Sequence, residues 1–308
     1  MPRILSLIAS STEIVCALGF EGQLVGRSHE CDFPTSVQSL PFCTEPKFNV
    51  DGTSAEIDQR VKSILQEALS VYRIDEIKLK ELKPDIIITQ SQCEVCAVSM
   101  SDVNKAVSGL IGSKPQIVSL EPNQLTDVWN DINLVSEALK VPNEGKKLVR
   151  ELKQRIKNIE DEARKIVKKP TVACIEWIDP LMAAGNWMPE LVELGGGINL
   201  FGESGKHSPW MNWDNLKESD PDIILILPCG YNIERTKSEM TPLIEKPDWF
   251  QLKAVKNRQV YITDGNQYFN RPGPRLVESL EIIAEILHPI YFNFGHENTG
   301  WELLDTKL

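Results

Sequence analysis

Two short stretches of this 308-residue chain carry side chains that could bind a soft metal or exchange thiols. Cys93 and Cys96 form a CxxC pair directly after a predicted buried strand, and His29 and Cys31 belong to a His-Glu-Cys sequence that follows another. Thiolate and imidazole ligands suit zinc, cobalt or iron, and not magnesium or calcium. If neighbouring strand ends bring the two stretches together, they could hold such a metal or offer an axial ligand to the cobalt or iron of a larger ligand.

The CxxC pair allows two other interpretations. It could be a redox pair that opens a helix after a strand, although the rest of a thioredoxin-like pattern is absent. Its thiols could also be small side chains that only shape a loop, and a single CxxC does not decide between these possibilities. The chain has seven cysteines, an odd number that suits a reducing compartment better than a disulfide framework.

Aromatic side chains gather after the predicted strands of the second half of the chain. In mostly parallel sheets, ligands bind outside the carboxyl ends of the strands. Aromatic walls with a few polar groups suit a large planar ligand, although each single aromatic could instead pack a core. The residues concerned are Trp177, Trp187, Trp210, Tyr231 and Tyr268. We therefore expect this group to line or border a binding cleft.

The elements that must position these residues alternate between strand and helix. Continuous apolar runs at 84–89 (PDIIIT) and 223–227 (IILIL) are typical of buried parallel strands. Three hydroxyl residues, Ser10, Ser11 and Thr12, stand where they could cap a helix predicted at 13–18. The pattern predicts an α/β protein with mainly parallel sheets.

A charged segment without Gly or Pro, residues 146–169, lies between the two halves. Its apolar residues recur at helical spacing in one narrow stripe, which predicts a single helix roughly 36 Å long. Such a helix would join two α/β lobes with a ligand cleft between them. Leu152, Ile156, Ile159 and Ala163 should face protein. The expected divisions are an N-terminal lobe at 1–142, a connecting backbone helix at 143–169 and a C-terminal lobe at 170–308.

Composition and absent motifs limit the possible functions. A net charge of −11 argues against nucleic acid as a partner, and no apolar stretch approaches the ~20 residues that insert into a bilayer. The sequence lacks the GxGxxG, GxxxxGK[ST], GxSxG and HExxH signatures, which favours a binding protein over an enzyme. The first residues, MPRILSLIASS, show no signal-peptide pattern. We therefore expect a cytoplasmic protein, or a periplasmic one if a signal peptide was removed.

Five stretches occur in a characteristic order: RILSLIASSTEIVCALG, VGRSHECDFP, LKPDIIITQ, PELVELGGGINLFG and DGNQYFNRPGPRLVESLE. Their order and spacing resemble the vitamin B12 (cobalamin) substrate-binding proteins of ABC importers, the helical-backbone metal-receptor type of the periplasmic binding protein fold. The resemblance covers nearly the whole chain. It implies two α/β lobes joined by one helix, little hinge closure and a corrinoid held in the cleft.

The resemblance also implies roles for single residues. The family loop that reaches the corrin ring matches residues 28–32, and the family aromatic before an arginine motif matches Tyr268, with Arg271 and Arg275 in the arginine positions. The docking glutamate of the C-terminal lobe matches Glu193. Its N-terminal counterpart is displaced, since Ile77 occupies the position and Glu76 stands beside it. These two acids would seat the protein on an ABC permease.

The expected function is non-catalytic binding of a cobalamin-like corrinoid or a related metal tetrapyrrole. The expected ligand-binding residues are Ser10, Ser28, His29, Glu30, Gln90, Trp177, Trp187, Trp210, Tyr231, Tyr268 and Arg271. The candidate ligands for zinc, cobalt or iron are Cys93, Cys96, His29 and Cys31. One alternative is a cytoplasmic thiol- or metal-handling protein or enzyme that uses CxxC with His-Glu-Cys. A second alternative is an exported ABC-importer binding protein whose signal has been removed.

Overall fold

The computed structural model divides the chain into two compact units, which are described one at a time. Unit 1 consists of Met1–Gly52, Glu56–Pro122 and Thr126–Glu151, and unit 2 of Thr53–Ala55, Asn123–Leu125 and Leu152–Leu308. The residues that the structure describes are 1–66, 71–91, 99–108 and 114–305. No helix in these ranges is both long and apolar enough to cross a membrane.

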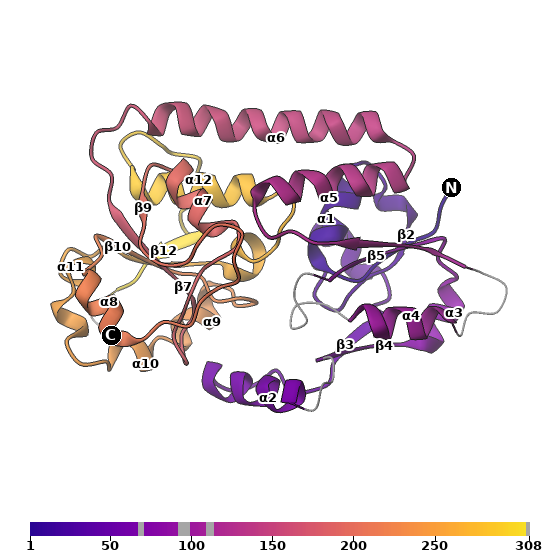
Figure 1. Ribbon diagram of the computed structural model, residues 1–308, viewed down its shortest axis with the longest axis horizontal. Coiled ribbons are helices and arrows are strands. Elements are labelled where there is room, and N and C mark those ends of the chain that lie inside the picture. The colour runs from indigo at the N-terminus through magenta and orange to yellow at the C-terminus, as the bar shows by residue number, and fades with distance from the viewer. Residues whose placement is uncertain (67–70, 92–98, 109–113, 306–308) are drawn as a thin grey trace. The chain divides into compact units, whose positions relative to one another are not determined.

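The centre of unit 1 is a parallel four-stranded sheet in the order β2-β1-β5-β6 (Figure 1). Its strands are β1 (Ile4–Ser6), β2 (Leu24–Gly26), β5 (Ile86–Gln90) and β6 (Gln116–Leu120). The apolar run at 86–88 is buried, as expected for a parallel strand covered on both faces. A separate antiparallel pair joins β3 (Thr44–Pro46) to β4 (Tyr72–Ile74).

Helices connect these strands, as the strand–helix alternation predicts. They are α1 (Ala9–Ala17), α2 (Ser54–Gln66), α3 (Glu76–Leu82), α4 (Met100–Ser108) and α5 (Leu125–Ala138), with short 3-10 turns η1 (Glu21–Gln23) and η2 (Thr35–Ser39). The predicted hydroxyl cap at residues 10–12 was wrong. Helix α1 begins at Ala9, its N-cap is Ile8, and Ser11 Oγ donates back to the Ile8 carbonyl at 3.0 Å. The early start of the helix places the hydroxyls inside its first turn, where they are buried.

Unit 2 contains a six-stranded sheet in the order β12-β11-β10-β7-β8, with β9 paired to β7. The central strands β7, β10 and β11 are parallel, whereas β8 and β12 run antiparallel to their neighbours. The strands are β7 (Thr171–Trp177), β8 (Met182–Ala183), β9 (Ile198–Asn199), β10 (Ile223–Ile226), β11 (Val260–Thr263) and β12 (Trp301–Leu303). The core forms where Ile175, Ile226 and Ile262 pack with Trp249.

The helices of unit 2 are mostly short. They are α7 (Met188–Leu194), α8 (Trp213–Ser219), α9 (Ile233–Ser238), α10 (Thr241–Ile244), α11 (Lys253–Lys256) and α12 (Leu276–Leu287), together with the 3-10 turn η3 (Trp249–Gln251) and the π-helical turn η4 (Gly265–Phe269). Helix α7 packs on α12, where Gly195 at the end of α7 allows Ile283 and Leu280 to approach closely.

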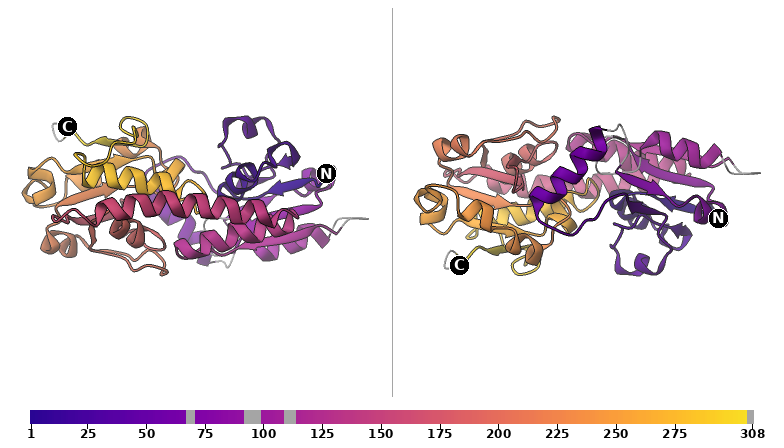
Figure 2. Two further views of the ribbon diagram at one scale, coloured as in Figure 1. Left: turned by 90° about the horizontal axis from the view of Figure 1, so that it is seen from above. Right: turned by 90° about the horizontal axis from the view of Figure 1, so that it is seen from below.

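Helix α6 (Pro142–Ala163) is one unbroken helix that begins in unit 1 and ends in unit 2 (Figure 1). Its stripe residues Leu152, Ile156, Ile159 and Ala163 are buried, which confirms the predicted face. In unit 2 it runs beside α12 (Figure 2), and Arg155 pairs with Glu281 of α12 at 2.7 Å.

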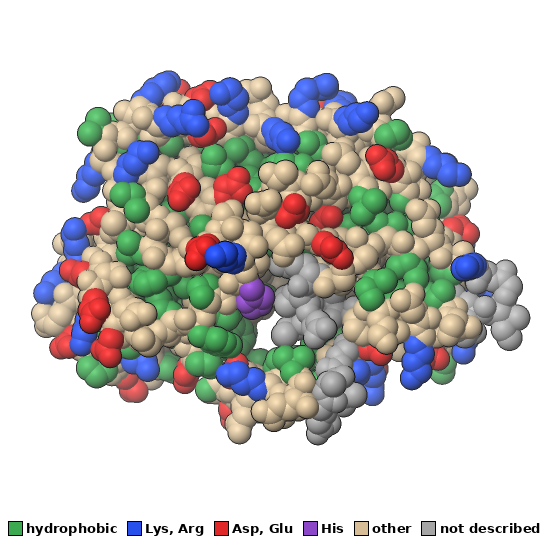
Figure 3. All heavy atoms as spheres, viewed as in Figure 1, with side chains coloured by type: hydrophobic (Ala, Val, Ile, Leu, Met, Phe, Trp, Pro, Cys, Tyr) green, Lys and Arg blue, Asp and Glu red, His purple; other side chains and the backbone are tan. Residues whose placement is uncertain are grey.

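The predicted bounds of this helix, residues 146–169, were wrong at both ends. Pro142 starts it earlier, because proline fits the first helical turn well. The helix ends at Ala163, although the next stripe residue, Ile166, is still buried; Val167 beyond it is 97% exposed. Lys and Arg side chains gather over α6 (Figure 3), so its outer face is solvated. The exposed basic residues of the helix include Lys146, Lys147, Arg150, Lys153 and Lys157.

Candidate functional site: loops at the carboxyl ends of the parallel strands

In unit 1, the loop after β2 holds His29 against the β3–β4 pair. The Nδ1 atom of His29 lies 2.8 Å from Thr44 Oγ1, and its ring centroid lies 5.1 Å from that of Tyr72. The hydroxyl of Tyr72 donates to Glu30 Oε1 at 3.0 Å. Two predicted ligand residues, His29 and Glu30, are therefore oriented by two residues that the sequence analysis missed. Neither Thr44 nor Tyr72 follows a parallel strand, and their three-residue strands left no recognisable pattern.

The surroundings of His29 keep its imidazole neutral. Burial is the largest cause that lowers the pKa of His29 below 6.5, and the positive charge of Arg27 lowers it further. Glu45 and the hydrogen bond with Thr44 oppose this shift without overcoming it. At neutral pH the ring is therefore uncharged, which is the form that binds metals.

Other predicted residues of unit 1 line the same sheet edge but are more deeply placed. Ser28 is buried, and its Oγ accepts hydrogen bonds from Thr44 Oγ1 at 3.0 Å and from the Glu30 N–H at 3.4 Å. Gln90 is buried at the end of β5. Ser10 is buried in the first turn of α1, and its Oγ has no hydrogen-bond partner within the described ranges. These side chains offer polar atoms beneath the edge and little exposed surface.

Only part of the predicted metal site, His29 and Cys31, lies within the described residues. Cys93 and Cys96 lie outside the described residues. Cys31 is buried, and its Sγ accepts a hydrogen bond from Thr12 Oγ1 at 3.0 Å. Across the described part of the chain, no group of three or more His, Cys, Asp or Glu side chains is placed to hold a metal. Cys31 thus contributes to packing beneath α1, and the role of the CxxC pair stays a prediction.

In unit 2, the carboxyl ends of β7, β10 and β11 bring aromatic side chains together. The rings of Trp177 and Tyr231 lie 5.3 Å apart with an interplanar angle of 52°. The loop that follows β11 joins them, because the Asn266 N–H donates to the Tyr231 carbonyl at 3.0 Å. We call Trp177, Tyr231 and Tyr268 of this loop the aromatic edge; Trp177 and Tyr268 are half-buried, whereas Tyr231 is buried. Burial raises the pKa of both tyrosines, so their phenols stay uncharged at neutral pH.

The other predicted residues of unit 2 differ in how much surface they offer. Trp210 is 58% exposed. Trp187 is buried, and its Nε1 donates to the Phe269 carbonyl at 2.9 Å, so it supports the η4 turn from below. Arg271 is also buried and donates to Asn266 Oδ1 at 2.9 Å. Both residues shape the loop that carries Tyr268.

Arg275, at the second arginine position of the motif, also acts on this loop. Its side chain is buried and donates to the Gln267 side-chain and main-chain oxygens at 3.0 and 2.8 Å. Its guanidinium carbon lies 4.7 Å from the ring centroid of Tyr268. The arginine motif therefore fixes the orientation of an aromatic side chain.

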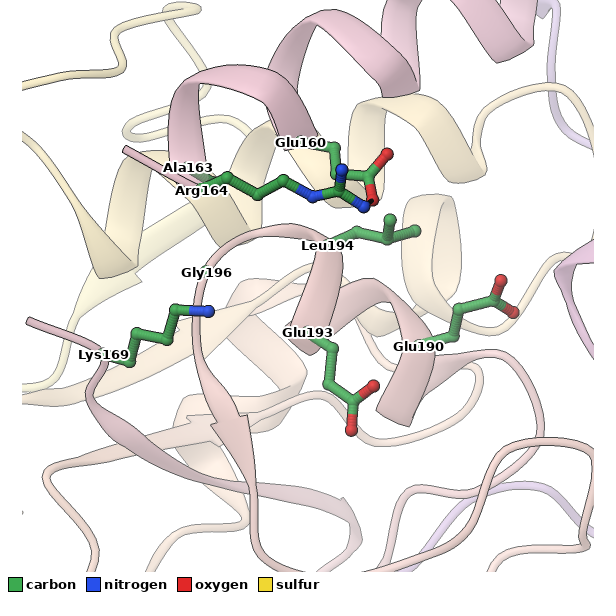
Figure 4. A pocket seen from close by; sticks show the side chains of 8 residues that line it. All are labelled: Glu160, Ala163, Arg164, Lys169, Glu190, Glu193, Leu194 and Gly196. Carbon is green, nitrogen blue, oxygen red and sulfur yellow. Dashed lines mark hydrogen bonds and ion pairs between the residues drawn. The ribbon is translucent and has the colours of Figure 1, made fainter. Parts of the chain in front are cut away.

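A cavity of about 230 Å³ lies in unit 2 beside the end of α6 (Figure 4). It is lined by Glu160, Ala163, Arg164, Lys169, Glu190, Glu193, Leu194 and Gly196. Pockets for drug-sized ligands measure roughly 300–1,000 Å³, so this cavity is too small for a macrocycle. Arg164 is also paired with Glu160 inside it. The predicted docking residue Glu193, which lines this cavity, is exposed on α7. The other predicted docking residue, Glu76, is exposed as the first residue of α3.

The chain belongs to the periplasmic binding protein family, whose model matches residues 4–267. It is 24% identical to an uncharacterised ABC transporter substrate-binding lipoprotein of Bacillus subtilis over 94% of this chain and 81% of that protein. It is 22% identical to the vitamin B12-binding protein of Vibrio cholerae over 92% of this chain and 88% of the relative. The crystal structure of S. aureus IsdE complexed with heme matches with a TM-score of 0.70 at 18% identity, covering 94% of this chain and 99% of that one.

These comparisons confirm the family that the sequence resembled and the α/β fold class. The curated relatives are named as binding proteins and not as enzymes. A structural likeness at such low identity shows the fold alone, so the ligand has to be argued from the loops described above.

Proposed function

We propose that this chain binds a metal tetrapyrrole without transforming it, with a corrinoid as the first candidate. The observation that carries the proposal is the aromatic edge, where Trp177 and Tyr231 form a tilted pair at the carboxyl ends of two parallel strands. The half-buried rings of Trp177 and Tyr268 supply uncharged aromatic surface, which suits the broad, mostly apolar face of a macrocycle, and the buried Tyr231 packs against Trp177. The similarity to a vitamin B12-binding protein over most of the chain supports a corrinoid.

Heme is the second candidate, and one observation favours it specifically. His29 presents a neutral imidazole at the sheet edge of unit 1, and imidazole is a common ligand of heme iron. A heme complex is also among the structures with the same fold. Corrinoids and heme share a flat ring around a metal with axial positions, so the two candidates make the same demands on the loops.

We further propose that the protein delivers its ligand to an ABC permease and acts outside the cytoplasmic membrane. The support is the naming of the Bacillus relative as a substrate-binding lipoprotein of an ABC transporter. This favours the exported alternative over a cytoplasmic one. Glu193 and Glu76 are the proposed docking residues, since both carboxylates are exposed. Replacing either with Arg should weaken capture by the permease while ligand affinity stays unchanged.

Titration with aquacobalamin, cobinamide and hemin tests the proposed function. Calorimetry should show one site per chain for at least one probe, with quenching of tryptophan fluorescence by the absorbing macrocycle. Trp177→Ala should weaken binding about tenfold, equivalent to about 1.4 kcal/mol, because it removes half of the ring pair. Trp213→Phe is the matched control, since Trp213 packs on Trp249 in the core of unit 2. Absence of binding by all three probes would remove the tetrapyrrole proposal.

The thiol alternative can be separated in the same assay. A double Cys93→Ser, Cys96→Ser variant should bind the three probes as the wild type does if the thiols take no part in the site. Loss of binding with an intact circular dichroism spectrum would instead support a direct role for the thiols in ligand or metal contact.

A further inference from the structure

The segment that follows α12, residues 288–305, is held to unit 2 by one buried carboxylate. Glu285 of α12 is 4% exposed. It accepts hydrogen bonds from the main-chain N–H groups of Gly295 and His296 at 2.6 and 3.2 Å, and from Trp301 Nε1 at 3.0 Å. We call residues 288–305 the C-terminal segment; the family model ends before α12 and does not cover it. These bonds fix the main chain of the segment at His296.

The side chain of His296 is anchored in turn to two helices of unit 2. Its Nε2 lies 3.0 Å from Glu281 Oε2 on α12, and the other oxygen of Glu281 accepts from Arg155 Nη2 on α6 at 2.7 Å. Burial raises the pKa of Glu281, but the hydrogen bonds with His296 and Arg155 outweigh it and hold this pKa below 4.5. An ionised carboxylate can only accept, so the proton of this bond lies on His296 Nε2.

Charged groups on both helices act on His296. The hydrogen bond with Glu281 is the largest cause that raises its pKa above 6.5, and the negative charges of Glu285 and Glu278 add to it, whereas burial opposes the shift. Arg155 reaches the imidazole only through Glu281. The charged pair is therefore complete below pH 6.5 and becomes a neutral hydrogen bond, roughly half as strong, as the pH rises through the raised pKa.

The imidazole of His296 also contacts Tyr268 of the aromatic edge. The two ring centroids lie 6.0 Å apart with an interplanar angle of 71°, an edge-to-face arrangement. The guanidinium of Arg275 is a second contact, 4.7 Å from the centroid of Tyr268. The C-terminal segment meets the start of the same loop as well, because the Asp264 N–H donates to the Gly300 carbonyl at 2.9 Å. The segment thus contacts both the loop and the ring that it carries.

We propose that His296 is a positioning residue for Tyr268, and that the C-terminal segment through it sets how tightly the aromatic edge binds its ligand. This inference rests on the proposed function, in which Tyr268 contacts the ligand. An edge-to-face pair restricts the tyrosine ring before the ligand arrives. A side chain that is already ordered loses less conformational entropy on binding, so the affinity is higher.

Two variants of His296 separate the positioning of Tyr268 from the anchoring of the segment. His296→Gln keeps an N–H donor for Glu281 and removes the ring, so it should retain the melting temperature but bind cyanocobalamin and hemin about 3–10-fold more weakly. His296→Phe keeps a ring without the donor, so it should retain more of the affinity and lower the melting temperature. His207→Asn changes an exposed histidine of unit 2 and is the matched control. Equal affinities of His296→Gln and wild type would overturn the inference.

Fluorine NMR tests the positioning without any ligand. A 4-fluorophenylalanine in place of Tyr268 reports on the surroundings of the ring and carries no phenol that could titrate. Its signal should shift with pH, with a midpoint above 6.5 that follows the raised pKa of His296. The shift should be absent when His296→Gln is added. The same label at Phe250, an exposed ring of unit 2, is the control and should not titrate. A signal at position 268 that is insensitive to both pH and His296→Gln would refute the positioning role.

The outcomes separate this inference from the proposed function. If the wild type binds a probe and His296→Gln binds it equally well, the role of His296 is wrong while tetrapyrrole binding stands. If the wild type binds neither cyanocobalamin nor hemin, the proposed function fails together with the effect on affinity, and the fluorine titration still decides whether His296 holds the ring of Tyr268. Weaker binding by His296→Gln at an unchanged melting temperature, together with the loss of the fluorine titration, supports the inference.

Discussion

Replacing Asp131 with asparagine should change how the stability of the protein depends on pH. Asp131 lies on α5, is 6% exposed, and its Oδ2 has no hydrogen-bond partner within the described ranges. Its Oδ1 accepts a long hydrogen bond of 3.4 Å from the Glu121 N–H. Burial raises the pKa of Asp131 from 3.8 to about 7, and the negative charges of Asp127 and Glu121 add to the effect.

The size and sign of the effect follow from this pKa. The folded protein binds a proton that the unfolded chain releases between pH 4 and 7, so the contribution of Asp131 to stability is complete below pH 4. It is lost as the pH rises through about 7. Three pH units at about 1.36 kcal/mol each give about 4 kcal/mol as the largest loss. The amide side chain of the variant cannot ionise, so this loss should disappear.

Urea denaturation followed by circular dichroism, repeated from pH 4.5 to 8, measures the difference in unfolding free energy between variant and wild type. The introduced amide leaves one polar group unpaired, which costs about 1–3 kcal/mol at every pH. The test is therefore how the unfolding free energy of the variant, relative to that of the wild type, changes with pH. Relative to the wild type, the variant should be more stable at pH 8 than at pH 4.5 by about 2–4 kcal/mol. Glu137→Gln, an exposed change on the same helix, should show no such trend. A pH-independent difference for Asp131→Asn would refute the reasoning.

Two further predictions concern α6 and His29. Ile156→Asp should lower the unfolding free energy by about 2 kcal/mol or more, because it buries an unpaired charge. The control Asn158→Asp changes an exposed residue of the same helix and should alter the unfolding free energy by no more than about 0.5 kcal/mol. Equal effects of the two variants in thermal unfolding would contradict the buried stripe. The affinity for hemin should fall as the pH drops below the lowered pKa of His29, since the protonated ring cannot coordinate a metal. The same titration of His29→Ala should lack this loss.

Much of the site's framework follows from local sequence patterns. The apolar runs at 84–89 and 223–227 predicted parallel strands, and the structure contains β5 and β10 at these places. Parallel strands place their following loops at one sheet edge, so the sequence could nominate His29, Glu30, Trp177 and Tyr231. It could not show which of these side chains offer surface, because exposure depends on neighbours far along the chain.

The sequence by itself determined the family, the α/β class and the buried face of α6, because apolar periodicity and motif order are local properties of the chain. Tertiary structure decided the details that carry chemistry. Thr44 and Tyr72 reach His29 only after the chain closes loops of 15 and 43 residues, and no local pattern encodes such contacts. For the same reason, the sequence could not show that Trp187 is buried in unit 2 and donates a hydrogen bond to the Phe269 carbonyl, 82 residues away.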